Sequence, residues 1–315
     1  MGRGGSPLAV SAAGLDFRNP IVLAAGTAGY GHELADVLAL DALGGLVTKA
    51  VSLEERAGNP APRLAEFDGG MINAVGLANP GLARVQREHL PWLAGNVRGT
   101  RKLWNIVGFA EDEYARVIAG LEGAPGAAEA IDAYELNLSC PNTSHGGLEF
   151  GAEPAAVTSV VRRARAETRK PLFVKLSPVL QDIAHIARVA VDAGADGLTL
   201  VNTIPGLVID VERRVPAIGN GNGGVSGAAI LPVGVLATWK VSRAVSVPII
   251  GLGGVRSASD VVQYVLAGAS LVGMGTAAMR DPRQPERVVR ELEAWCASHG
   301  VSQLSDLRGA LEWPA

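Results

Sequence analysis

The chain has 315 residues, of which 48% are hydrophobic and 40 are glycine, so we expect a compact globular protein rather than a disordered one. A formal net charge of −3, without a basic stripe, excludes an electrostatic case for nucleic-acid binding. Two cysteines, far apart in the sequence, argue against a disulfide framework and are typical of a reducing, cytoplasmic compartment.

The N-terminus is too weakly apolar for a secretory signal, and no apolar run approaches the length of a membrane span. We therefore expect no membrane association. Residues 8–20 precede the first strong apolar run and are expected to form a short β-hairpin. The five histidines show no metal-ligand spacing, so no metal site is expected.

Eight short apolar runs follow in chain order, each ending in small or polar residues, and each is a predicted strand. They span residues 21–26, 45–50, 103–108, 134–140, 172–178, 197–203, 248–254 and 271–276. Helix-like segments separate them, at residues 33–43, 82–93, 112–122, 154–167, 180–193, 229–245, 258–267 and 285–298. Ser257 followed by Asp260 resembles a helix-capping box.

Eight successive β-α units predict a parallel sheet, and their number favours an α/β fold made of one closed (β/α)₈ TIM barrel with a short N-terminal β-hairpin at its bottom. A doubly wound open sheet is the alternative. No internal repeat or linker is found, so residues 1–315 are predicted to form a single domain.

The predicted strand ends carry unusual residues. Lys or Asn, both poor strand formers, stands at five of the eight ends, namely Lys49, Asn105, Asn137, Lys175 and Asn202. Singly, each Asn reads as a turn residue, and each lysine as one that extends to solvent. Because the carboxyl ends of barrel strands meet at one mouth, together they predict hydrogen-bonding groups for a planar, amide-rich ligand.

One strand leads into a reactive-looking thiol. The run at residues 133–138 is followed by Ser-Cys-Pro-Asn, a turn signal, so Cys140 is expected where a strand stops and a loop begins. A cysteine has an unperturbed pKa of about 8.5, and modest tuning brings it close to working pH. Cys140 is therefore a candidate proton-transferring base.

Two glycine-rich turns end the last two predicted strands. They contain Gly253 and Gly254, then Gly275 and Thr276, and bare N–H groups at such helix starts predict a phosphate-binding site. Residues 219–224 match G-x-G-x-x-G but follow no apolar strand, so they predict a flexible loop over the barrel mouth rather than a Rossmann turn. Residues 224–228 are expected to start the sixth helix.

These features together resemble the dihydroorotate dehydrogenases over nearly the whole chain. The resemblance is carried by residues 58–63, 73–77, 137–142, 174–178, 194–197, 202–203, 224–227 and 251–254. It implies an FMN-dependent (β/α)₈ barrel that oxidises dihydroorotate to orotate in pyrimidine biosynthesis. A catalytic Cys marks the class 1 enzymes of this family, whereas the membrane-associated class 2 enzymes use Ser.

Residues 146–151 are similar to the class 1B branch, which passes electrons to NAD⁺ through a separate FAD and [2Fe–2S] subunit. This chain lacks the cysteines to hold such a cluster itself. The resemblance thus implies a homodimer or a 2+2 heterotetramer with that partner. A fumarate-dependent class 1A enzyme, a dihydropyrimidine dehydrogenase-like enzyme and a non-redox phosphate-binding lyase or isomerase remain alternatives.

The resemblance also implies roles for individual residues. Cys140 would be the general base. The expected FMN contacts are Ala25, Lys49, Ala50, Asn105, Asn137, Lys175, Val201, Gly227, Gly253, Gly254, Gly275 and Thr276. The expected dihydroorotate contacts are Lys49, Asn73, Ala74, Val75, Gly76, Leu77, Asn137, Asn202 and Thr203. Ala25 departs from the family pattern, in which Ser is common, and the residues flanking Asn105 also differ from it.

Overall fold

The computed structural model describes residues 6–138 and 150–314. Eight parallel strands close into a barrel, so the predicted TIM barrel is confirmed. All eight predicted strands are present, although each ends before its predicted boundary. In barrel order they are β3 (Ile21–Leu23), β4 (Gly45–Val47), β7 (Arg101–Ile106), β8 (Ala133–Asn137), β9 (Leu172–Leu176), β10 (Gly197–Leu200), β15 (Ile249–Leu252) and β16 (Leu271–Met274).

The bottom of the barrel is closed by the predicted hairpin. Strands β1 (Val10–Ala12) and β2 (Leu15–Phe17) pair in antiparallel fashion, and Ala12 and Phe17 are buried. They join an apolar cluster inside the barrel, near the amino ends of the strands, that includes Phe173. Because side chains fill the barrel interior at this end, a ligand that enters the barrel is expected at the carboxyl ends of the strands.

Helices form the outer layer, with α3 against α5, α5 against α6, α6 against α7 and α7 against α8. Among the described residues, no helix is both long and apolar enough to cross a membrane. The helices are α1 (Gly81–Arg84), α2 (Leu90–Asn96), α3 (Glu111–Glu122), α4 (Ala127–Ala130), α5 (Pro154–Glu167), α6 (Ile183–Asp192), α7 (Leu231–Ser242), α8 (Ala258–Leu266), α9 (Thr276–Arg280) and α10 (Gln284–Ser298), with a π-helix at Val85–His89 between α1 and α2. Short 3₁₀ turns lie at Leu40–Ala42, Phe150–Ala152, Ala228–Ile230 and Leu304–Leu307.

One predicted helix is wrong. Residues 33–43 form turns and the 3₁₀ turn Leu40–Ala42 instead of an α-helix. Leu38 and Leu40 are both buried, and residues two apart do not share one face of an α-helix. Core packing therefore overrides the local helical pattern. By contrast, the predicted capping box at Ser257 and Asp260 is confirmed.

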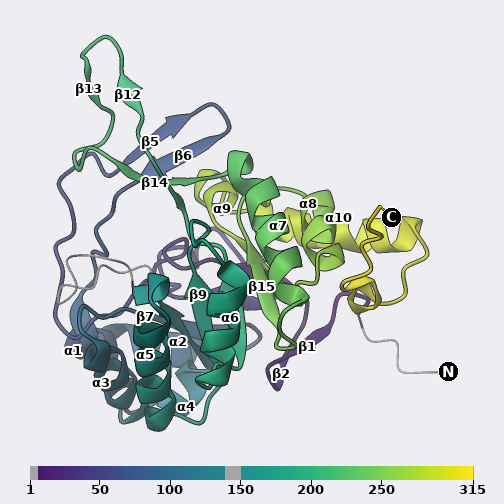
Figure 1. Cartoon of the computed structure of the whole chain (residues 1–315). Coiled ribbons are helices and arrows are strands. Elements are labelled where there is room, and N and C mark those ends of the chain that lie inside the picture. Colours follow the sequence, from purple (N-terminus) through teal and green to yellow (C-terminus); the bar gives the residue numbers. More distant parts are fainter. Residues whose placement is uncertain (1–5, 139–149, 315) are drawn as a thin grey trace.

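A second, antiparallel sheet was not predicted from the sequence. It consists of β5 (Leu64–Phe67), β6 (Gly70–Asn73), β11 (Ile204–Gly206) and β14 (Gly223–Ser226), in the order β11-β14-β6-β5. A hairpin of β12 (Ile209–Asp210) and β13 (Val215–Pro216) projects beside it. In Figure 1 these strands lie at the top, away from the β1–β2 hairpin.

This sheet corrects two predictions about the glycine-rich segment. Gly223 and Gly224 are not part of a flexible loop, because they lie in β14. Residues 224–228 do not start the sixth helix, because α7 begins only at Leu231. A glycine-rich strand shows no alternation of apolar and polar side chains in the sequence. Strand β14 is instead recognised by its pairing with β6.

Candidate active site

The structure brings together two asparagines that the sequence placed at separate strand ends. Asn137 is the last residue of β8, and Asn202 lies just past the end of β10. The Nδ2 of Asn202 donates to the Oδ1 of Asn137 over 3.3 Å, and the Oδ1 of Asn202 accepts from the backbone N–H of Thr203 at 2.8 Å. Tyr114 donates its hydroxyl to the carbonyl of Asn137 at 3.0 Å. Asn137, Asn202 and Thr203, predicted for the substrate side, thus form one cluster.

The antiparallel sheet joins Asn73 to this cluster. The Nδ2 of Asn73 donates to the carbonyl of Gly224 at 3.1 Å. Gly224 also lies so close to Thr203 that a Cβ at Gly224 would overlap the Oγ1 of Thr203. Asn73 is therefore linked to the cluster by Gly224, whose lack of a side chain leaves room for Thr203.

The predicted substrate loop, residues 74–77, continues from β6 and is held by two other asparagines. Asn59 donates through its backbone N–H to Val75 at 3.1 Å and through Nδ2 to the carbonyl of Ala74 at 3.2 Å. Asn79 donates through Nδ2 to the carbonyl of Leu77 at 2.8 Å. Asn59 and Asn79 are absent from the predicted site. Their signal in the sequence is that they are polar residues on either side of the predicted substrate loop.

Lys175 is a buried cation near the end of β9. Its exposed fraction is 7%, and in the described part of the chain no ion pair involves it. Lys102 is similarly buried, at 6%, but it lies 3.6 Å from Asp132 and donates to the carbonyl of Val97 at 3.1 Å. A buried, unpaired ammonium group costs free energy. Lys175 therefore fits a negatively charged or electron-rich ligand.

Lys49 lies at the end of β4 and is half-buried. Its backbone N–H donates to the carbonyl of Gly29 at 2.7 Å. Within residues 6–138 and 150–314 its ammonium group also has no ion pair. The two strand-end lysines are thus both available to an anionic ligand.

A buried polar network inside the barrel was not predicted. The carboxylate of Glu135 accepts from the Nδ2 of Asn105 and from the Oγ1 of Thr199, each at 2.7 Å. All three side chains are about 1% exposed. The Oδ1 of Asn105 is buried without a described hydrogen-bond partner, a state that costs about 1–3 kcal/mol. The signal for Glu135 in the sequence is its position two residues before Asn137, since alternate strand residues share a face.

A cavity of about 280 Å³ lies at the ends of β15 and β16. Four predicted cofactor residues, Gly227, Gly254, Gly275 and Thr276, line it, together with Arg256 and others. The N–H groups of Arg256 and Ser257 donate to the side chain of Asp260, so the start of α8 is already capped. The start of α9 at Thr276 has no side-chain cap, so it stays the candidate for the predicted phosphate contact.

The other predicted cofactor residues lie around the same mouth. The carbonyl of Ala50 accepts from the hydroxyl of Tyr30 at 2.9 Å, and that of Gly253 accepts from Tyr264 at 2.8 Å. Burial, reinforced by the charge of Asp260, raises the pKa of Tyr264 and keeps it a donor. The N–H of Val201, at the end of β10, donates to the carbonyl of Leu252 at 2.9 Å. Ala25 lies just beyond β3 and is half-buried. Cys140 lies outside the described residues.

The orphan acceptor of Asn105, the unpaired Lys175 and the glycine-lined cavity at the start of α9 together fit FMN. An isoalloxazine ring carries an N–H donor and an electron-rich edge, and its phosphate matches free N–H groups at a helix start. The described residues therefore supply the donor, acceptor and charge that this cofactor requires.

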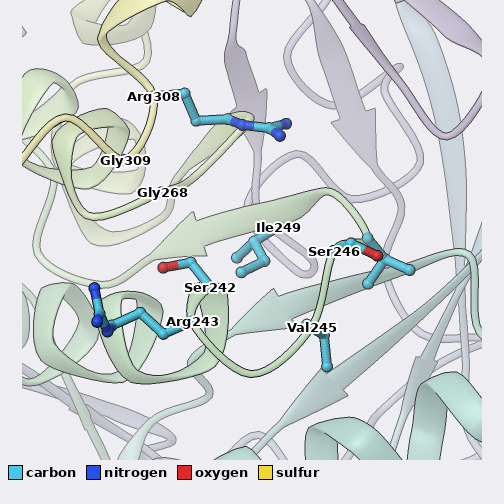
Figure 2. A pocket seen from close by; sticks show the side chains of 9 residues that line it. Ser242, Arg243, Val245, Ser246, Ile249, Gly268, Arg308 and Gly309 are labelled. Carbon is cyan, nitrogen blue, oxygen red and sulfur yellow. The ribbon is translucent and has the colours of Figure 1, made fainter.

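A second cavity, of about 490 Å³, lies at the opposite end of the barrel. Ile249 at the start of β15 and Gly268 before β16 line it, and Figure 2 shows Arg243 and Arg308 extending beside it from separate segments. Arg308 donates to the hydroxyl of Ser270 at 2.8 Å. None of the predicted site residues lines this cavity, so it is separate from the candidate active site.

Known proteins similar to this chain point to one family. The family model described as dihydroorotate dehydrogenase matches residues 7–295. A protein of Pelobacter propionicus, named dihydroorotate dehydrogenase B (NAD(+)), catalytic subunit, is 45% identical over 305 residues, covering 97% of this chain and 98% of that protein. A protein of Desulforudis audaxviator with the same name is 47% identical over 302 residues, covering 96% of each.

Among solved structures, a crystal structure of DHODH from Eimeria tenella in complex with ferulenol matches with a TM-score of 0.81 at 24% identity, covering 98% of this chain and 90% of that one. At this identity the likeness supports the fold alone. The family model matches most of the chain, and the two relatives are more than 40% identical to it over nearly its full length. This chain therefore belongs to the dihydroorotate dehydrogenase family.

Proposed function

We propose that the protein oxidises (S)-dihydroorotate to orotate, a step of pyrimidine biosynthesis, with FMN as its cofactor. The observation that carries the proposal is the gathering of Asn137, Asn202 and the unpaired Lys175 at one barrel mouth. Amide groups suit the ring of a dihydropyrimidine, which has both N–H donors and carbonyl acceptors. When bound, FMN supplies a two-electron acceptor for the hydride that leaves C6 of the substrate.

The chain's own residues bind, orient and deprotonate the substrate. Lys49 neutralises the substrate carboxylate, and Asn73, Asn137 and Asn202 hold the ring edges by hydrogen bonds. Cys140 takes the proton from C5 of the substrate. Lys175 stabilises the negative charge that reduction adds to the cofactor.

We also propose that the electrons pass to NAD⁺ through a separate subunit carrying FAD and a [2Fe–2S] cluster. The support is the name shared by the two relatives and the presence of only two cysteines in this chain, fewer than the four that such a cluster takes. Low cysteine usage also fits a reducing, cytoplasmic location.

For the assembly we propose a homodimer, or a 2+2 heterotetramer with that partner, in which residues 1–315 form one FMN-binding domain. The support is an exposed apolar surface on and before the β12–β13 hairpin, where Leu207, Ile209 and Val211 are 56%, 55% and 74% exposed. Apolar groups clustered on a projecting element are typical of subunit interfaces.

The test is anaerobic addition of dihydroorotate to the FMN-loaded chain. Loss of the oxidised flavin absorbance, followed by its return on adding fumarate or NAD⁺, reports both half-reactions. Return with NAD⁺ only in the presence of the partner subunit supports the proposal. Return with fumarate and the chain alone favours the class 1A alternative, and failure to bind FMN favours a non-redox barrel.

A further inference from the structure

Glu135 is a buried carboxylate inside the barrel that the proposed mechanism does not use. Its register partner on β9 is Phe173, which belongs to the interior cluster at the barrel bottom, so Glu135 points into the barrel above that layer. It accepts hydrogen bonds from Asn105 on β7 and Thr199 on β10, at 2.7 Å each. One carboxylate therefore ties together side chains from three strands of the barrel.

This contact decides which way the Asn105 amide faces. A carboxylate only accepts hydrogen bonds, so it must face the NH₂ group of Asn105 and not its oxygen. The backbone of Asn105 is also occupied, because its N–H donates to Thr48 at 3.2 Å and its carbonyl accepts from Val51 at 2.9 Å. The Oδ1 is the one polar atom of Asn105 left without a described partner, and it is buried.

The same carboxylate shares the barrel interior with Lys175. Thr199 and Lys175 are register partners on β10 and β9, so their side chains lie on the same face of the sheet. Thr199 reaches Glu135, whereas Lys175 has no ion pair with it or with any other described carboxylate. Glu135 thus offsets the charge of Lys175 at a distance, in an interior where charges are poorly screened.

We propose that Glu135 is a positioning residue for the flavin. Glu135 holds the Asn105 side chain so that the amide oxygen is left as the acceptor, and this oxygen selects an N–H donor at the edge of the flavin ring. The negative charge of Glu135 also makes reduction of the flavin less favourable. The inference rests on the proposed binding of FMN at this mouth. Asn105 sets the affinity for the cofactor through this bond, and Glu135 sets the midpoint potential through its charge.

The central variant is Glu135→Gln, which keeps the shape but removes the charge and the demand for a donor. We expect it to raise the Kd for FMN roughly tenfold, about 1.4 kcal/mol, because the Asn105 amide is no longer held in one orientation. The two-electron midpoint potential of the flavin should become more positive. Reduction adds negative charge near Lys175, and this variant removes the negative charge of Glu135 that opposes it. Flavin fluorescence quenching and dye equilibration measure the two quantities, with the melting temperature of the apoprotein as the check on folding.

A double-mutant cycle with Asn105→Ala tests the route of the effect. If Glu135 acts through Asn105, Glu135→Gln adds less than twofold to the FMN Kd of the Asn105→Ala protein. Thr199→Val is the matched variant: it keeps the charge and the Asn105 bond, so the potential should stay unchanged while the Kd rises two- to fivefold.

The inference would be overturned if Glu135→Gln had the FMN Kd and the midpoint potential of the wild type. It would also be overturned if the effects of Glu135→Gln and Asn105→Ala on the FMN Kd were fully additive. Should Glu135→Gln not fold, an FMN Kd unchanged in Thr199→Val overturns it instead. A wild-type apoprotein that takes up no FMN would count against the proposed function itself, which separates that failure from a failure of the role of Glu135.

Discussion

The side-chain amides of Asn202 and Asn137 meet across the barrel mouth at 3.3 Å, although 65 residues separate them in the chain. This N···O separation lies just beyond the usual range of about 2.7–3.2 Å, so the bond is weak. The Nδ2 of Asn202 also carries a second N–H donor. A substrate that offers both donors and acceptors can therefore displace this contact at little cost.

Replacement of Asn202 should impair substrate binding without loss of cofactor. We expect Asn202→Ala to lower kcat/KM for dihydroorotate by about ten- to a hundredfold, because a buried hydrogen bond to the substrate is lost. FMN content should stay at the wild-type level. The matched control is Asn220→Ala, because Asn220 is exposed and its side chain donates to the carbonyl of Asn222 within its own loop. Equal losses in the two variants would contradict the role of Asn202.

Removal of the two buried lysines should change apoprotein stability in opposite directions. Lys175→Met should raise the free energy of unfolding of the apoprotein by about 1 kcal/mol, because it removes a buried ammonium group that has no ion pair among the described residues and is offset by Glu135 only at a distance. Lys102→Met should lower it by about 1 kcal/mol, because it removes the hydrogen bond to the carbonyl of Val97 and one of the two cations beside Asp132, which keeps Arg101 at 3.0 Å. Urea denaturation of both apoproteins measures the difference. FMN binding should weaken only in Lys175→Met.

A methyl group in the cavity at the start of α9 should oppose phosphate binding without harming the fold. In Gly275→Ala the added Cβ would meet Ala24 and the Thr27 hydroxyl at ordinary contact distances of 3.8 Å, so stability should change little. We expect the FMN Kd to rise by about tenfold or more because the cavity is partly filled, while the Kd for riboflavin, which lacks the phosphate, should change little.

Gly254→Ala provides the contrast. Gly254 has a φ of +77°, and its Cβ would lie 2.7 Å from Leu231. We expect this variant to lose about 1–3 kcal/mol of stability in the apoprotein as well. A Gly275→Ala protein that bound FMN and riboflavin as the wild type does would show that the phosphate lies elsewhere.

Cys140 is predicted to be the general base. Replacing Cys140 with Ala should leave FMN bound and slow flavin reduction by dihydroorotate by ~10²–10⁴-fold, the usual contribution of general-base catalysis. Anaerobic stopped-flow absorbance measures this step in a single turnover. Cys296→Ala is the control, since Cys296 is buried in α10 at 1% exposure. An unchanged rate for Cys140→Ala would remove this residue from the mechanism.

Acid should destabilise the apoprotein partly through His89. Burial lowers the pKa of His89, with the charge of His32 acting in the same direction, so the folded protein binds this proton less tightly than the unfolded chain does. The stabilisation is therefore complete above the unfolded pKa of about 6.5 and is lost as the pH falls below it toward the lowered pKa. His89→Gln should flatten urea stability across that range. His185→Gln, at an exposed position on α6, should leave the wild-type slope.

Much of this protein could be predicted from its sequence because the signals are local. Each barrel strand is a short apolar run with a polar end, and α5 begins and ends at its predicted residues, Pro154 and Glu167. The capping box at Ser257 needs only four consecutive residues. The exception at residues 33–43 shows the limit, since the burial of both Leu38 and Leu40 is a demand of the core and not of the local pattern.

The sequence by itself determined the alternation of strands and helices, and with it the barrel and the mouth at which its polar strand ends gather. Only the tertiary structure decided that Glu135 meets Asn105 and Thr199, which are 30 and 64 residues away, and that β14 pairs with β6 to bring Asn73 to Thr203. The physical reason is that periodicity and turn chemistry act between neighbours in the chain. Closure of the barrel chooses contacts between distant residues, and those contacts set the charge and hydrogen bonding of the site.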